Sequence, residues 1–223
     1  MKRGIFLFLF IFSCLILPAE EPLRLLSWNV ESGGALSRVI AEQLTAFQQA
    51  HLVTLVEVDD ADRDLYTKAL GDQRISVLSR SGARYNDHIL VIFDPRRLEL
   101  LSTEELHEYR GTVITPSVDR GGKRSPLILR FRDLLTGVEF FYVSVHLERT
   151  NEAQRKLQSL VLREWILDQG TPVLAVGDFN FDYSFGEQPG GNDSFLIFTY
   201  DPRIDWIEPE VFVDTNYSER NGV

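Results

Sequence analysis

The spacing of apolar residues divides the chain into segments with two different periods. Short aliphatic and β-branched runs bounded by polar turns predict strands over 24–29, 52–58, 75–78, 89–93, 98–101, 127–131, 140–147 and 173–176. Apolar residues at every third or fourth position predict helices over 35–50 and 152–167, and a shorter polar helix is expected over 60–70.

The order of these segments indicates the fold class. Helical segments come early and late, whereas strands joined by tight turns fill the middle of the chain. We therefore expect an α+β domain in which two mixed sheets pack face to face with helices outside. A length of 223 residues suits one domain with a full core, which we place at residues 20–223.

The N-terminal residues predict a secretory signal peptide over 1–19. Lys2 and Arg3 precede an apolar run over 5–17 that is too short to cross a bilayer, and Pro18-Ala19 follows it. We expect a secreted or periplasmic protein with no stable membrane span after processing. Lipid anchoring through Cys14 is the less favoured alternative, because the residues before it make a poor lipobox.

The amino-acid composition limits the kinds of catalytic, metal-binding and nucleic-acid-binding site that the protein can have. Cys14 is the only cysteine, so its removal with the signal would exclude disulfides, thiol catalysis and thiolate zinc sites. The formal net charge of -10 argues against a protein that coats nucleic acid through a broad basic surface. A nuclease that contacts phosphate through a metal and a few arginines remains compatible with this charge.

Candidate chemistry lies where the predicted strands end. Asp178 and Asn180 follow one strand two residues apart, so both side chains point to the same side. A carboxylate holds a divalent cation or accepts a proton, and an amide donates to an anionic oxygen. Asn29, Glu57 and His146 end other strands. Because the ends of neighbouring strands meet at one rim of a sheet, these residues indicate metal-assisted chemistry on a phosphate.

Four motifs resemble the endonuclease/exonuclease/phosphatase superfamily, which includes pancreatic-type deoxyribonucleases, abasic-site endonucleases, sphingomyelinases and inositol-phosphate phosphatases. They are Leu26-Ser27-Trp28-Asn29-Val30, Leu55-Val56-Glu57, Val143-Ser144-Val145-His146-Leu147 and Gly177-Asp178-Phe179-Asn180. The resemblance implies a four-layer α/β/β/α sandwich of two mixed sheets with outer helices. It also implies Mg²⁺ as the cofactor, with Mn²⁺ as an alternative, since hard oxygen ligands suit both ions.

The resemblance implies a role for each residue of these motifs. Glu57 is expected to be the principal metal ligand, and Asn29 to order the metal or the phosphate. His146 is expected to donate to the scissile phosphate and stabilise the charge that builds on it. Asp178 would orient or activate the attacking water, and Asn180 would support the pentavalent transition state.

A basic residue facing the phosphate is implied at Arg124, which belongs to a compact cluster with Arg120 and Lys123. The same cluster would also suit a solvated hairpin turn. Asn86-Asp87 resembles another segment near the family's site, although the residues themselves define no role for it.

The closing Ser-Asp-His motif of the family has no counterpart here. The four histidines are His51, His88, His107 and His146, so none follows Asp178. We therefore expect a chain that lacks roughly thirty to sixty residues and its last strands relative to the family, with weak or absent activity as it stands.

The sequence is compatible with three functions. The first is a secreted Mg²⁺-dependent endonuclease or exonuclease that hydrolyses phosphodiesters by in-line attack of water, with nucleic acid as its substrate partner. The second is a phospholipid or sugar-phosphate phosphodiesterase or phosphatase. The third is a catalytically impaired binding remnant. The sequence leaves the number of metals and the oligomeric state open.

Overall fold

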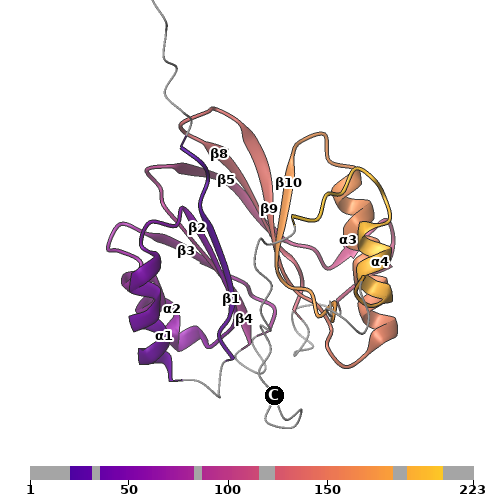
Figure 1. The fold of residues 1–223 in the computed structure, drawn as a ribbon, viewed down its shortest axis with the longest axis horizontal. Coiled ribbons are helices and arrows are strands. Elements are labelled where there is room, and N and C mark those ends of the chain that lie inside the picture. The colour runs from indigo at the N-terminus through magenta and orange to yellow at the C-terminus, as the bar shows by residue number, and fades with distance from the viewer. Residues whose placement is uncertain (1–20, 32–35, 83–86, 116–123, 183–189, 208–223) are drawn as a thin grey trace, which may run out of the picture.

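The computed structural model describes residues 21–31, 36–82, 87–115, 124–182 and 190–207. Within these residues, two four-stranded sheets stack face to face, and helices cover their outer faces (Figure 1). The layer order is therefore α/β/β/α, which confirms the predicted fold class.

Both sheets are mixed. The first has the order β1-β2-β4-β3 and contains β1 (Leu25–Asn29), β2 (Leu52–Val58), β4 (His88–Phe93) and β3 (Ile75–Leu78). The second has the order β10-β9-β8-β5 and contains β10 (Val173–Asp178), β9 (Glu139–His146), β8 (Leu127–Asp133) and β5 (Leu98–Glu105). The pairs β1–β2 and β9–β10 are parallel, and the other pairs are antiparallel. A two-stranded ribbon joins β6 (Glu108–Tyr109) to β7 (Thr112–Val113).

In the described part of the chain, two α-helices cover the outer face of each sheet. Figure 1 shows α1 (Ser37–Leu44) and α2 (Arg63–Ala69) outside the first sheet, and α3 (Glu152–Leu167) and α4 (Asp193–Thr199) outside the second. Short 3₁₀ turns, η1 (Thr45–Phe47) and η2 (Asp60–Asp62), follow α1 and precede α2. None of the helices in the described ranges is long and apolar enough to span a bilayer.

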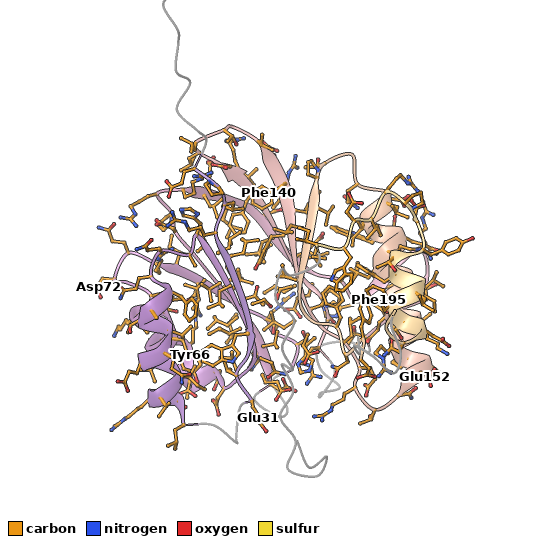
Figure 2. All side chains as sticks on the ribbon, in the orientation of Figure 1. Glu31, Tyr66, Asp72, Phe140, Glu152 and Phe195 are labelled. Carbon is orange, nitrogen blue, oxygen red and sulfur yellow. The ribbon has the colours of Figure 1, made fainter. Side chains whose placement is uncertain are left out.

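Three apolar layers result from the period-two alternation of the strands. In β2, Leu52 and Val56 face the second sheet, whereas Val53 and Leu55 pack against the α1–α2 side. The inner layer continues into β8 and β9 through Phe131 and other large side chains, and a third layer lies between the second sheet and α3–α4 (Figure 2). This packing fixes the relative position of the two sheets and hence of their strand ends.

Most predicted elements are confirmed, and a few differ in extent. The helix predicted over 35–50 ends at Leu44 and tightens into η1, and β5 continues to Glu105 because β8 pairs with it along its whole length. The prediction did not include α4, although Asn192 caps it through hydrogen bonds from the backbone N–H groups of Ser194 and Phe195. The signal peptide and residues 208–223 lie outside the described residues.

Among the described strands, β1 and β10 each form one edge of their sheet, and the two lie in contact with each other. Every residue of β10 is partly exposed, unlike the buried strands β4 and β9 beside the centre of the sandwich. The expectation that the chain lacks its last strands stays a prediction.

Candidate active site

Four strand ends meet at one rim of the sandwich. Asn29 ends β1, Glu57 lies near the end of β2, His146 ends β9 and Asp178 ends β10. Asp178 and His146 are register partners in the parallel β9–β10 pair, so their side chains start from neighbouring positions. Figure 2 labels Glu31, just beyond the end of β1, at this end of the molecule. The predicted residues are thus brought together by the parallel pairing in each sheet.

Asn29 joins carboxylates from the two sheets. Its Nδ2 donates to Glu57 Oε1 at 2.8 Å and to Asp178 Oδ2 at 3.0 Å. The backbone N–H of Glu31 donates to Asn29 Oδ1 at 3.0 Å, which orients the amide so that its nitrogen faces the carboxylates. Asn29 therefore positions the two acidic groups, and metal binding by its oxygen would require the amide to turn.

A β-bulge turns Glu57 toward this rim. The β2–β4 register shifts between Val56 and Val58, and Glu57 has φ +61°. Such a φ is strained for a residue with a side chain, and strain of this kind often occurs at functional sites. The bulge keeps both neighbouring valines buried while the Glu57 side chain stays 24% exposed. Glu57 can therefore reach a ligand from solvent.

His146 lies beneath the carboxylates and is almost completely buried. Its Nε2 is 3.5 Å from Glu57 Oε1 and 3.9 Å from Asp178 Oδ2. Burial, together with the charge of Arg124, lowers the pKa of His146 to about 4, against the opposing effect of Asp178. The imidazole is therefore neutral at neutral pH.

Asp87 is a site residue to which the sequence assigned no role. It forms an ion pair with Arg124, and both side chains are largely buried. On its other side, Asp87 Oδ1 faces His146 Nδ1 at 3.8 Å. Burial lowers the pKa of Arg124, whereas the nearby charges of Glu57 and Asp178 raise it. Arg124 consequently supplies positive charge beside the predicted metal and phosphate site.

Asn180 has a clear structural contact in addition to its predicted role. Its backbone N–H donates to Asp178 Oδ1 at 2.9 Å, and its Nδ2 donates to the Leu147 carbonyl at 3.0 Å. The residue has φ +50°, which this pair of hydrogen bonds stabilises. Asn180 therefore links the segment after β10 to the segment after β9, and its contact with a transition state stays a prediction.

The side chains at the rim form a donor set suited to a divalent cation. Glu57 and Asp178 present two carboxylates to one amide group, and Mg²⁺ in proteins commonly takes one or two carboxylates together with water and substrate phosphate. Across the described ranges, no group of three or more His, Cys, Asp or Glu side chains forms an all-protein metal cage. The residues fit an open divalent-metal site that water and substrate would complete.

The structure thus groups Asn29, Glu57, His146 and Asp178 directly, with Arg124 attached through Asp87 and Asn180 adjoining. Arg120 and Lys123 lie outside the described residues. Two signals in the sequence pointed to Asp87, its place in a segment that resembles one near the family's site and its position immediately before the buried strand β4, and neither defined its role.

Fold and rim together define an α/β/β/α sandwich with an acidic site at the carboxyl ends of β1, β2, β9 and β10. The chain belongs to the Endonuclease/Exonuclease/phosphatase family, whose pattern matches residues 26–207. Members of this family are phosphoric ester hydrolases that generally use divalent metal ions. A comparison with curated proteins gave no match.

Solved structures share this fold. A family protein from Bacteroides thetaiotaomicron has a TM-score of 0.59 at 18% identity, over 79% of this chain and 66% of that chain. A mannosyl-6-phosphatase, Bt3783, from the same species has a TM-score of 0.58 at 16% identity, over 79% and 68%. TDP2 from D. rerio, complexed with a single-strand DNA product, has a TM-score of 0.52 at 19% identity, over 69% and 59%. The chain spans about two thirds of the length of the first two structures.

Proposed function

We propose that this protein is a secreted or periplasmic, Mg²⁺-dependent phosphodiesterase, with nucleic acid as its first candidate substrate. The observation that carries the proposal is the pair of carboxylates, Glu57 and Asp178, held by one amide beside the buried His146. The family supports phosphoric ester hydrolysis in general. The TDP2 structure with a DNA product supports a nucleic acid substrate by analogy.

Each residue of the rim then has a defined task. Glu57 would hold Mg²⁺, which would supply positive charge to offset the negative charge of the phosphate oxygens. Asp178 would accept the proton of the attacking water. With the charge of Glu57 taken up by the metal, the carboxylate of Asp87 would favour the proton of His146 on Nδ1, and Nε2 would then present a lone pair to the rim. The negative charge of a bound phosphate favours protonation of Nε2, which would then donate to a phosphate oxygen.

Sugar-phosphate hydrolysis is the second candidate function. It is favoured by the likeness to a mannosyl-6-phosphatase and by the net charge of -10, which disfavours long contacts with nucleic acid. Both functions use the same rim, and only the leaving group differs.

The test compares the wild-type chain with Glu57→Gln on plasmid DNA, RNA, sphingomyelin, inositol phosphates and mannose 6-phosphate, with and without Mg²⁺. We expect Glu57→Gln to lower any Mg²⁺-dependent rate by about a hundredfold or more, since the ligand loses its charge. Glu42→Gln, the same substitution on the exposed face of α1, is the matched control and should retain the wild-type rate. Mg²⁺-dependent cleavage that survives Glu57→Gln would show that the metal assignment is wrong.

A further inference from the structure

Two loops follow the strand ends that carry His146 and Asp178, and side chains of α3 contact both loops. The segment 147–151 follows His146 at the end of β9, and the segment 179–182 follows Asp178 at the end of β10. The backbone of each loop continues directly from the catalytic residue that precedes it. A fixed geometry of the loop backbone therefore helps to hold that side chain in its position. The N-terminal turns of α3 supply that geometry through side chains which the proposed chemistry does not use.

Arg155 of α3 contacts both loops. It is only 6% exposed, and its Nη1 donates to the Glu148 carbonyl at 3.0 Å and to the Arg149 carbonyl at 2.7 Å. Its Nη2 lies 3.9 Å from Asp182 Oδ2. One planar guanidinium therefore holds the loop after β9 by its backbone and the loop after β10 by a carboxylate. A lysine ammonium has the charge but lacks this fixed fork.

Further hydrogen bonds connect the same two loops to each other and to the neighbouring helices. Gln158 Oε1, also buried, accepts from the backbone N–H of Glu148 at 2.8 Å. Asn180 donates to the Leu147 carbonyl, and Asn192 Nδ2 donates to the Asn180 carbonyl at 3.0 Å and to Asp182 Oδ2 at 3.1 Å. The loops are thus bonded to each other, to α3 and to the cap of α4.

The backbone of the second loop is strained. Asn180 has φ +50° and Asp182 has φ +45°, and such values persist only where the surroundings hold them. The contacts of Arg155 and Asn192 with this loop provide the restraint.

We infer that Arg155 is a positioning residue that couples the His146 loop to the Asp178–Asn180 loop and keeps their side chains in one arrangement. It touches neither the rim carboxylates nor the imidazole, so it acts through the loop backbones. The catalytic consequence rests on the proposed function, whereas the mechanical coupling does not.

The experiment compares Arg155→Met with Arg163→Met in the full chain. Arg163 is the matched control, because it lies on the same helix and donates through Nη1 to the Ile197 carbonyl at 2.7 Å, away from the catalytic loops. Hydrogen exchange read by mass spectrometry should rise about tenfold or more in both 147–151 and 178–182 for Arg155→Met. Arg163→Met should leave both segments as protected as in the wild type.

Two further variants keep the inference testable if Arg155→Met is too unstable. Arg155→Lys should recover part of the protection in 147–151, since one ammonium can still bond a carbonyl. Asp182→Ala changes a side chain that is 74% exposed, and it should raise exchange in 178–182 without raising it in 147–151. Unchanged exchange in both segments for Arg155→Met, or for Asp182→Ala in its own segment, would overturn the inference.

Kinetics separate this inference from the proposed function. If the wild type hydrolyses a substrate, Arg155→Met should lower kcat about ten- to a hundredfold with little change in KM, because orientation and not binding is lost. If the wild type hydrolyses nothing, the proposed function fails, and the exchange data alone still decide whether Arg155 couples the loops. A rise in KM at constant kcat would contradict the positioning role.

Discussion

Asp87 Oδ1 and His146 Nδ1 face each other at 3.8 Å, and both are buried atoms with no hydrogen-bond partner within the described part of the chain. A separation of 3.8 Å exceeds a hydrogen bond, so the pair is aligned without being bonded. A small shift of either side chain on substrate binding would close this distance. Asp87 is thus placed to select which nitrogen of His146 carries the proton.

Asp87→Asn is expected to change the tautomer of His146. The amide can present N–H to Nδ1, which then accepts and leaves the proton on Nε2. ¹⁵N chemical shifts of labelled histidine should move from the Nδ1–H to the Nε2–H pattern. His51 is the internal control, because its Nδ1 already accepts from the backbone N–H of Arg24 at 3.0 Å. A His146 spectrum identical to the wild type would contradict the orienting role of Asp87.

The lack of a side chain at Gly177 allows β10 to lie close to β9. It has φ +123°, and a side chain there would collide with the Val145 carbonyl. We expect Gly177→Ala to destabilise the fold by about 2–4 kcal/mol in urea unfolding, because overpacking adds to backbone strain. Gly137→Ala is the control, since Gly137 has φ +75° and open space around its Cα. Equal losses for the two variants would mean that the close approach of the strands is unimportant.

A hydrogen bond crosses the interior between the two sheets. Thr54 Oγ1 and Tyr142 Oη are 2.8 Å apart and both residues are fully buried, which raises the pKa of the Tyr142 hydroxyl. Tyr142→Phe should lower the free energy of unfolding by about 1–3 kcal/mol, because Thr54 loses its partner. The double variant Thr54→Val/Tyr142→Phe should recover part of this loss, as measured by thermal or urea unfolding. Strictly additive losses would show that the two hydroxyls do not interact.

The ionisation of Asp94 makes the free energy of unfolding depend on pH in the acid range. Hydrogen bonds from Arg96 lower the pKa of Asp94 to about 2, against the opposing effect of burial, and the charge of Arg74 acts in the same direction as Arg96. A carboxylate with a lowered pKa stabilises the fold above its unfolded pKa of about 4 and loses that contribution as the pH falls toward 2. Asp94→Asn should therefore be less stable than the wild type by about 1–2 kcal/mol at pH 7.

The difference between the two proteins should shrink between pH 4 and pH 2, as followed by urea midpoints at each pH. Other carboxylates titrate in the same range in both proteins, so only the difference is informative. A gap between wild type and Asp94→Asn that is independent of pH would contradict the assignment.

The local pattern of apolar and polar residues was sufficient to predict most of the helices and strands. The strand 52–58 and the helix 152–167 were predicted with their observed ends, because the aliphatic run of the first and the apolar stripe of the second act within a few residues. By contrast, β5 extends over polar residues of its own and exists to Glu105 only because β8 offers hydrogen bonds. Its length could not be predicted without the partner strand.

The candidate site likewise contains residues that the sequence predicted and residues that only the structure revealed. Strand-end motifs and a family resemblance identified Asn29, Glu57, His146 and Asp178, and the structure places all four in contact. No signal in the sequence pointed to Arg155, and for Asp87 there was only a resemblance to a segment near the family's site that defined no role. Their roles follow from contacts between residues far apart in the sequence. Asp87 meets His146 across 58 intervening residues, and no local pattern reports such a contact.

The sequence by itself determined the layers of the sandwich and the chemical types at its rim, because hydrophobic period and residue identity are local properties. Only the tertiary structure decided that one amide joins Glu57 to Asp178 and that one guanidinium joins the two loops behind them. The physical reason is that hydrogen bonds and ion pairs depend on separations of a few ångströms. The packing of the two sheets sets those separations, and neither sheet specifies them alone.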